Sequence, residues 1–252
     1  MLIFDIETGP LPEEQLRELY EPLDESQVEG LVTWDFDPAS VKIGNLKDPA
    51  KIQEKIEAAR QSHESAKANA AAIIAAAREQ HWSQFVERAA LSPITGRILV
   101  IGYFATERNV TLVSQKPETE LLIEFWKKYE ECRTAGRKMV GHNIAGFDIP
   151  FLVRRSWLLD IPVPATVFDR GKWLDSDTLV DTLKLWKCGT NDGEPLDSLG
   201  RAFRLGGKTE GVNGGDFHRL WFGTEEDRAK AIEYATRDVV LTGQIAIRMG
   251  VI

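Results

Sequence analysis

Two acidic residues interrupt the apolar run that opens the chain, MLIFDIETGP. If this segment is a strand, residues two apart share a face, so Asp5 and Glu7 point together while Phe4 and Ile6 point the other way. Two carboxylates so close repel each other unless a cation lies between them, and hard cations such as Mg²⁺ prefer carboxylate oxygens. The strand therefore carries a metal-binding face or, in the simpler alternative, ends in a polar turn at Thr8-Gly9-Pro10.

The composition limits the class of protein. A chain of 252 residues suits one domain or two small ones, and 43% hydrophobic residues are enough for a real core. Cys132 and Cys188 lie far apart without metal-type spacing, which argues against a disulfide framework and favours a reducing, cytoplasmic location. No run of about 18 apolar residues occurs and the start lacks a signal-peptide pattern, so we expect no membrane span.

The negative charge is concentrated at the start of the chain. The formal net charge is −8, but residues 1–40 hold eleven acidic residues and one basic residue, and the remainder has a net charge of +2. An enzyme that holds metal ions between carboxylates needs part of its negative charge for that purpose. The overall sign therefore permits a polyanionic substrate, although it argues against tight, metal-free binding of DNA.

Alanine is concentrated between residues 48 and 91, where it fills 13 positions. Asp48-Pro49 suits a helix cap and first turn, so the stretch predicts one long helix or a helical hairpin with a break near residues 62–65. We interpret it as a helical insertion after the first strand, inside a single domain spanning residues 1–252. A packed helical cover is favoured over an arm that guides DNA.

Strand and helix patterns alternate after the insertion. Strands are predicted over residues 97–104, 109–114 and 138–142, with a turn at 106–108. Helices are predicted over residues 118–133, 147–159, 179–186 and 196–203, with Asp181 as the cap of the third. A last helix begins at a capping box of Thr224 and Asp227 and ends near Gly250. The glycine-rich residues 205–216 are interpreted as a loop that closes over substrate. This order predicts an α/β domain with a mixed sheet.

Further acids stand in two later segments. Asp148 lies just inside a predicted helix in GHNIAGFDIP, after Asn143, and Tyr234 and Asp238 lie four apart in YATRD, on one helical face. Each has a structural explanation when taken alone. An acid in a first turn favours the helix dipole, a buried tyrosine–carboxylate pair serves the core, and a lone His142 is more often a packed residue than a ligand.

The three motifs together resemble the DEDD (DnaQ-like) 3′–5′ exonuclease superfamily. FDIET is similar to its first motif, HNIAGFD to its second and YATRD to its third, in the tyrosine-bearing (DEDDy) variant, since the histidine of the other variant is replaced by Glu233. The resemblance covers residues 1–10 and about 95–250. It is nearest to the proofreading exonuclease domain of family-B DNA polymerases. Because no polymerase segment follows Ile252, we expect a stand-alone nuclease of phage or bacterial type, in the host cytoplasm if phage-encoded.

The resemblance implies both a fold and an activity. The fold would be an RNase H-like α/β domain, a mixed five-stranded sheet flanked by helices. The activity would be metal-dependent 3′–5′ exonuclease hydrolysis, which removes nucleoside monophosphates from the 3′ end of mainly single-stranded DNA. Two ions, Mg²⁺ or Mn²⁺, would lie between Asp5, Glu7, Asp148 and Asp238, with Asp5 bridging both ions. Tyr234 would orient the attacking water. Two such ions stabilise the attacking and the leaving oxygen of an in-line displacement.

Asn143, Phe147 and Thr8 are assigned to substrate binding, although core packing explains Phe147 equally well. Several basic residues either track phosphates or are ordinary surface charges, namely Arg154, Arg155, Lys184, Lys187, Arg201, Arg204 and Lys208. The motifs do not encode the sugar, so an exoribonuclease of the same superfamily is one alternative. A non-catalytic nucleic-acid-binding module is the other. A replication or repair partner is not identified.

Overall fold

The computed structural model describes residues 1–28, 31–32, 34–105, 110–114, 116–168, 174–206, 215 and 217–251. The chain divides into two compact units, one of residues 1–17 with 87–252 and one of residues 18–86. Across these described residues, no helix combines the length and the apolar character needed to cross a membrane.

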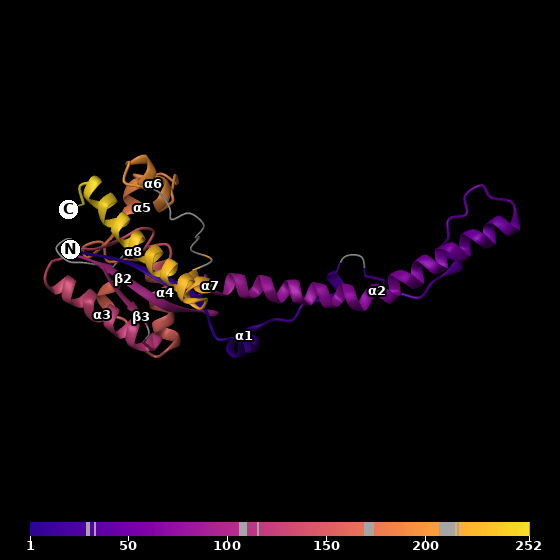
Figure 1. Cartoon of the computed structure of the whole chain (residues 1–252), viewed down its shortest axis with the longest axis horizontal. Coiled ribbons are helices and arrows are strands. Elements are labelled where there is room, and N and C mark those ends of the chain that lie inside the picture. The colour runs from indigo at the N-terminus through magenta and orange to yellow at the C-terminus, as the bar shows by residue number, and fades with distance from the viewer. Residues whose placement is uncertain are drawn as a thin grey trace. The chain divides into compact units, whose positions relative to one another are not determined.

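The larger unit, in which Figure 1 labels β2 and β3, is built on a five-stranded sheet in the order β3-β2-β1-β4-β5. The strands are β1 (Leu2–Pro10), β2 (Gly96–Phe104), β3 (Thr111–Ser114), β4 (Met139–Gly141) and β5 (Leu179–Asp181). β2 pairs antiparallel with β1 and β3, whereas β4 pairs parallel with β1 and β5. The predicted α/β fold with a mixed sheet is therefore confirmed.

β1 is longer than the sequence predicts. It continues through Thr8 and Gly9 to Pro10, so the turn proposed for these residues is wrong. The pairing with β2 changes register between Glu7 and Thr8, which inserts an irregularity of the β-bulge type without ending the strand. Glu7 is therefore followed by more sheet and lies within a buried strand.

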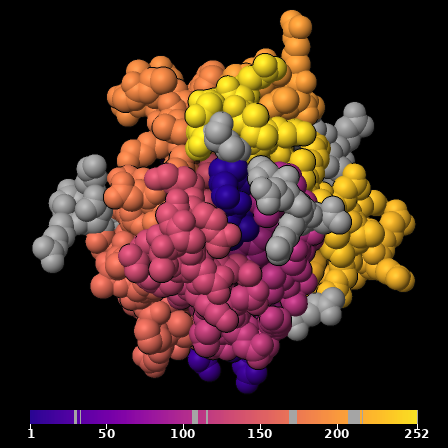
Figure 2. All heavy atoms as spheres, turned by 90° about the vertical axis from the view of Figure 1, so that its left-hand side faces the viewer, coloured from indigo at the N-terminus to yellow at the C-terminus, as the bar shows by residue number. Residues whose placement is uncertain are grey.

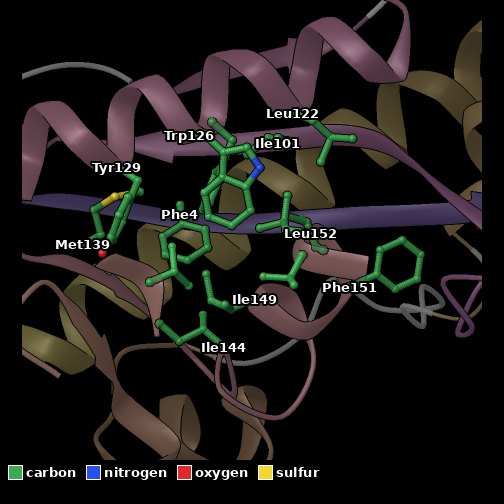
Figure 3. Close-up of a cluster of buried hydrophobic side chains, with 14 of the residues drawn as sticks. Phe4, Ile101, Leu122, Trp126, Tyr129, Met139, Ile144, Ile149, Phe151 and Leu152 are labelled. Carbon is green, nitrogen blue, oxygen red and sulfur yellow. The ribbon is translucent and has the colours of Figure 1, made fainter. Parts of the chain in front are cut away.

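Helices cover both faces of the sheet. α3 (Glu118–Thr134) and α4 (Asp148–Leu158) pack against one face, where Phe4 and Ile6 enter the main core. Figure 3 shows Phe4 among side chains of α3 and α4, including Trp126 and Ile149, and the Phe4 ring lies 5.2 Å from that of Phe125. α7 (Phe217–Trp221) and α8 (Glu225–Arg248) pack against the other face.

The start of β1 also lies between helices. In Figure 2 the indigo atoms of the chain's beginning are flanked by pink atoms of the α3 region and by yellow atoms of the C-terminal helix. Ile3 of β1 belongs to a cluster with Val140 of β4 and with Val239 and Ala246 of α8. Alternate residues of β1 therefore serve two different cores.

The remaining helices of this unit mostly follow their sequence signals. α5 (Thr182–Lys187) is capped by Asp181, α6 covers Leu196–Ala202, and a capping box of Thr224 and Asp227 begins α8. A short 3-10 turn covers Ala165–Val167. The predicted turn at 106–108 and most of the glycine-rich loop, 207–214 and 216, lie outside the described residues.

Most of α2 (Pro49–Ala89) forms the smaller unit, together with the short turns Glu25–Gln27 and Pro38–Ser40, whereas most of α1 (Glu13–Leu19) belongs to the larger unit. The predicted cap is present, since Asp48 Oδ1 accepts from Ala50 N at 3.0 Å. α2 is continuous, so the alternative of one long helix is confirmed and the hairpin with a break near residues 62–65 is wrong. Within residues 18–86 the Tyr20 hydroxyl and His81 Nδ1 are 2.7 Å apart, which holds the preceding chain against the helix.

Candidate metal centre

The sheet exposes the carboxylates of β1 to α8. Asp5 pairs with Gly102 of β2 and Glu7 pairs with Val100, so both acids lie on the face that Ile3 shares with α8, as the two-residue period predicts. Gly102 has no side chain here, and a Cβ at this position would lie only 2.9 Å from Cγ1 of Val239. The missing side chain therefore lets α8 approach β1 next to Asp5.

Asp148 reaches the same part of β1 as Asp5 and Glu7, from another direction. Among the described residues, β4 pairs with β1 only at Leu2 and Ile3, so the edge of β1 is open beyond Ile3. Asp148 begins α4, and its Oδ1 accepts from Ile6 N at 3.2 Å. This bond takes the place of a strand partner and brings a third carboxylate beside β1.

α8 supplies the last two groups. Tyr234 and Asp238 lie one helical turn apart on its inner face, and the Tyr234 hydroxyl donates a hydrogen bond to the Asp238 carboxylate. One carboxylate oxygen from each of Asp5, Glu7 and Asp238 lies within 4.8 Å of the others. Residues 5, 7, 148 and 238 are therefore brought together from three separate segments.

These carboxylates suit a divalent cation. Glu7 is buried at 6% exposure, and its Oε1 has no hydrogen-bond partner among the described residues. An unpartnered buried carboxylate oxygen is costly unless a cation occupies its lone pairs. Oxygen-only ligands of this charge match Mg²⁺ or Mn²⁺. Asp5, Glu7 and Asp238 thus fit a hard metal ion, with Asp148 beside them.

Burial raises the pKa values of these acids, and mutual repulsion raises those of Asp5 and Glu7 further. Burial raises the pKa of Asp5 well above its usual range, and the charges of Asp148 and Asp238 raise it further. The pKa of Glu7 is raised by burial and then by Asp5, Asp238 and Asp148. Burial raises the pKa of Asp148 to about 7 against the opposing hydrogen bond from Ile6 N. Without a cation, this cluster holds protons at a pH where ordinary carboxyls are ionised.

Tyr234 is kept neutral by its surroundings. Burial raises the pKa of its hydroxyl, and the charges of Asp238 and Glu7 raise it further. A phenol with a raised pKa cannot act as a general base near neutral pH. It can still donate and accept hydrogen bonds, so it is suited to orienting a water molecule.

The predicted substrate contacts differ in their environments. Asn143 is exposed with φ at 62°, in the left-handed region that asparagine tolerates. Phe147 is half-buried against the main core, with its ring 5.6 Å from that of Phe151. Thr8 is buried, and its hydroxyl donates to the carbonyl of Ala90 at 2.6 Å. The roles of all three residues in substrate binding stay predictions. The Thr8 side chain is not free to contact substrate, because its hydroxyl is bonded to Ala90 O.

Two further residues shape the turn between β4 and α4. His142 lies 2.9 Å from Thr182 Oγ1 through Nδ1 and 3.0 Å from Glu194 O through Nε2, so its ring is engaged on both sides. Asp181 accepts from the backbone of Asn143 and Ala145 as well as from α5. The sequence indicates Asp181 only as a helix cap, because its bonds to the turn cross 36 or more positions.

Arg155 is one of the phosphate contacts suggested by the sequence, and the structure gives it a different role. Its side chain is buried, pairs with Glu118 at 2.7 Å and donates to Pro93 O at 3.0 Å. Glu118 also accepts from Ile98 N. Arg155 is therefore a structural group that joins α4 to α3 and β2, and it cannot track phosphates.

The chain matches the model of a known family. The family described as "Predicted 3′-5′ exonuclease related to the exonuclease domain of PolB" matches residues 97–252, more than half of the chain. The matched range includes Asp148, Tyr234 and Asp238 but begins after β1. A search of curated proteins finds no match.

A solved structure has the same fold. The family B DNA polymerase from the hyperthermophilic archaeon Pyrobaculum calidifontis is similar to 65% of this chain, with a TM-score of 0.52 and 19% identity. The match covers 23% of the polymerase chain. The similarity therefore lies in the fold of one part of a much longer protein.

Proposed function

The chain belongs to the family of predicted 3′–5′ exonucleases related to the exonuclease domain of PolB, and we propose that it removes nucleoside monophosphates one at a time from the 3′ end of single-stranded DNA, with Mg²⁺ or Mn²⁺ as cofactor. Within the superfamily it is of the tyrosine-bearing type. The activity belongs to one domain of residues 1–252, in which residues 48–91 are an insertion.

One observation carries the proposal. Carboxylates of Asp5, Glu7 and Asp238, which lie up to 233 positions apart, converge within 4.8 Å beside the middle of β1. A fold gains nothing from bringing buried acids together, because their repulsion and desolvation both oppose it. A cation that bridges them removes both costs, and phosphoryl transfer is the chemistry that such cations support.

The acids would hold the cofactor and leave room for substrate. Asp5, Glu7 and Asp238 are the proposed ligands, and Asp148 contributes from the edge of β1 that is open beyond Ile3. When bound, divalent ions supply charge that lowers the pKa of water and neutralises the oxygens of the transferred phosphate. The carboxylates fix where that charge lies, and the hydrogen bond from Ile6 N fixes Asp148.

The neighbouring residues would orient the reactants. Tyr234 is held by Asp238 with its hydroxyl protonated, so it positions water through a hydrogen bond. Asn143, exposed on the turn before Asp148, would bind the terminal nucleotide. Phe147 would contact a base with the exposed part of its ring. A single strand is preferred because its unpaired bases and backbone are accessible to such contacts.

A labelled oligonucleotide tests the activity. Single-stranded DNA carrying a 5′ label is incubated with the protein and Mg²⁺ or Mn²⁺, and the products are separated on a denaturing gel beside an RNA of the same sequence. We expect a ladder of shortened DNA that EDTA abolishes. Preferential shortening of RNA would assign the chain to the exoribonucleases instead. Intact substrates of both kinds with both metals would refute the proposed activity.

A further inference from the structure

Asp181 ends β5 with an unusually full set of hydrogen bonds. Its Oδ1 accepts from Asn143 N at 2.9 Å, from Leu183 N at 2.9 Å and from Lys184 N at 3.3 Å, and its Oδ2 accepts from Ala145 N at 2.9 Å. Two of these bonds cap α5, as helix caps ordinarily do. The other two reach the turn between β4 and α4, which a cap does not require.

That turn needs an external support. Asn143 adopts a left-handed conformation that costs a non-glycine residue free energy. The turn closes on itself through bonds from Gly146 N and Phe147 N to Asn143 O. It also leads directly into Asp148 at the start of α4. A carboxylate that binds two of its N–H groups holds the strained backbone in one conformation.

We propose that Asp181 is a positioning residue for the exonuclease site, which fixes the turn of residues 142–147 so that Asn143 meets the substrate. This inference rests on the proposed function. Asp181 has no direct part in the chemistry, since it is buried and its two oxygens already accept four N–H groups. It acts through Asn143 and Ala145.

The substitution Asp181→Asn tests whether Asp181 supports the turn, without removing the cap of α5. If the amide oxygen replaces Oδ1, the three bonds there are kept, and the amide nitrogen then faces Ala145 N–H, donor against donor. The end of the turn at Ala145 is therefore released while α5 stays capped. We expect kcat/KM on single-stranded DNA to fall about tenfold, the worth of one charge-assisted hydrogen bond. Most of the change is a higher KM, because Ile6 N holds Asp148 independently.

Asp175 offers a matched control at the other end of β5. Its Oδ1 accepts from Asp177 N at 2.8 Å and Thr178 N at 3.3 Å, and its Oδ2 accepts from the Tyr129 hydroxyl at 2.9 Å. We expect Asp175→Asn to change kcat/KM by less than about twofold, because these bonds do not reach the turn. An equal loss of activity in both variants would mean that only general stability had been lost, and would overturn the proposal.

A double-mutant cycle asks whether the effect passes through Asn143. Asn143→Gly removes the side chain and keeps the left-handed backbone accessible. If Asp181 acts through Asn143, the double variant has nearly the same KM as Asn143→Gly alone. Independent, multiplying effects on KM would show that Asp181 acts elsewhere.

Amide hydrogen exchange supplies a readout that needs no turnover. We expect Asp181→Asn to speed exchange over residues 143–147 and to leave the amides of Leu183 and Lys184 unchanged. Unchanged exchange over 143–147, or a kcat/KM within about twofold of wild type, would overturn the positioning role. If the wild-type protein cleaves no nucleic acid, the proposed function fails, while the exchange rates still decide whether Asp181 holds the turn.

Discussion

At the scale of single residues, Asp238 belongs both to the cluster of acids and to the pair that it forms with Tyr234. It shares the carboxylate cluster with Asp5 and Glu7, accepts the hydrogen bond of Tyr234, and raises the pKa of both neighbouring acids. Its removal therefore has opposite effects on activity and on the stability of the metal-free protein.

We expect Asp238→Asn to reduce cleavage by at least about 1000-fold, since it removes a charge that holds the cofactor. Because it also removes repulsion inside the cluster, the melting temperature in EDTA is unchanged or higher than that of wild type. Gel assays and thermal melts measure the two effects. Wild-type cleavage rates in this variant would show that Asp238 is not part of the site.

Tyr234→Phe deletes one hydroxyl and keeps the ring packed against Phe217. If the hydroxyl orients water, kcat falls about 10- to 100-fold, as expected for one hydrogen bond in a charged site, while KM changes little. Single-turnover kinetics separate the two parameters. Because the pKa of Tyr234 is raised above its usual value, we expect the pH profile of kcat near neutral pH to keep every ionisation in this variant. Loss of an ionisation would mean that Tyr234 acts as a base.

The sequence predicts some of these residues better than others. That Asp5 and Glu7 share a face follows from the two-residue period of a strand. The contact of Asp148 with Ile6 depends on β4 ending early, which no local pattern shows. The alternative of a turn at Thr8 is wrong, and a register shift inside a strand leaves no signal in the sequence that would exclude it.

At the scale of elements, the packing of α8 on β2 sets the geometry of the site. Gly102 lies opposite Asp5, and a side chain there would meet Val239 Cγ1 at 2.9 Å and Leu112 Cδ2 at 3.3 Å. We expect Gly102→Ala to push α8 away from β1, at a cost of about 1–3 kcal/mol in the free energy of unfolding. Denaturant melts measure this cost.

The same variant separates packing from chemistry, because it leaves every acid in place. We expect its affinity for Mn²⁺ to fall, since Asp238 moves with α8 relative to Asp5. Gly136→Ala is the control, because no atom lies within 4 Å of its missing side chain, although its φ of 62° also costs stability. Equal affinities for Mn²⁺ in both variants would show that α8 does not set the distance between the acids.

The ion pair of Arg155 and Glu118 joins α4 to α3. The Arg155 side chain is buried and that of Glu118 is only 12% exposed, so removing one leaves the other charge unpaired and largely shielded from water. Arg155→Ala should lower the free energy of unfolding by about 3–5 kcal/mol. At a temperature where the variant is folded, its KM for DNA should equal that of wild type, as measured with the labelled oligonucleotide. A higher KM would restore Arg155 to the phosphate contacts.

Elements were predicted where their signals are local. The caps Asp48, Asp181 and Thr224 were identified because capping depends on three or four neighbouring residues. The three-residue β5 was not separated from the helix after it, since so short a strand has no readable period. The false break in α2 came from polar residues near position 63, which an exposed helix tolerates.

At the scale of the whole molecule, the acid cluster links stability to pH and to metal. The pKa values of Asp5, Glu7 and Asp148 are raised in the folded state, to about 7 for Asp148. Such groups stabilise the fold fully below their unfolded pKa of about 4, and this contribution is lost as the pH rises through the folded pKa.

We therefore expect the melting temperature in EDTA to fall as the pH rises from about 5 to 8. Mg²⁺ should raise the melting temperature more at pH 8 than at pH 5, because cations and protons compete for the same oxygens. Asp148→Asn should flatten the slope in EDTA. A stabilising effect of Mg²⁺ that is equal at both pH values would mean that the ion binds elsewhere.

Direct binding of Mn²⁺ tests the convergence of the acids most simply. Electron paramagnetic resonance of free Mn²⁺ counts the ions that the protein takes up at pH 8, without substrate or turnover. We predict saturable binding by wild type that is lost in Asp5→Asn and weakened in Asp238→Asn. Wild-type protein that binds no Mn²⁺, or an Asp5→Asn variant that binds it as well as wild type does, would contradict the account.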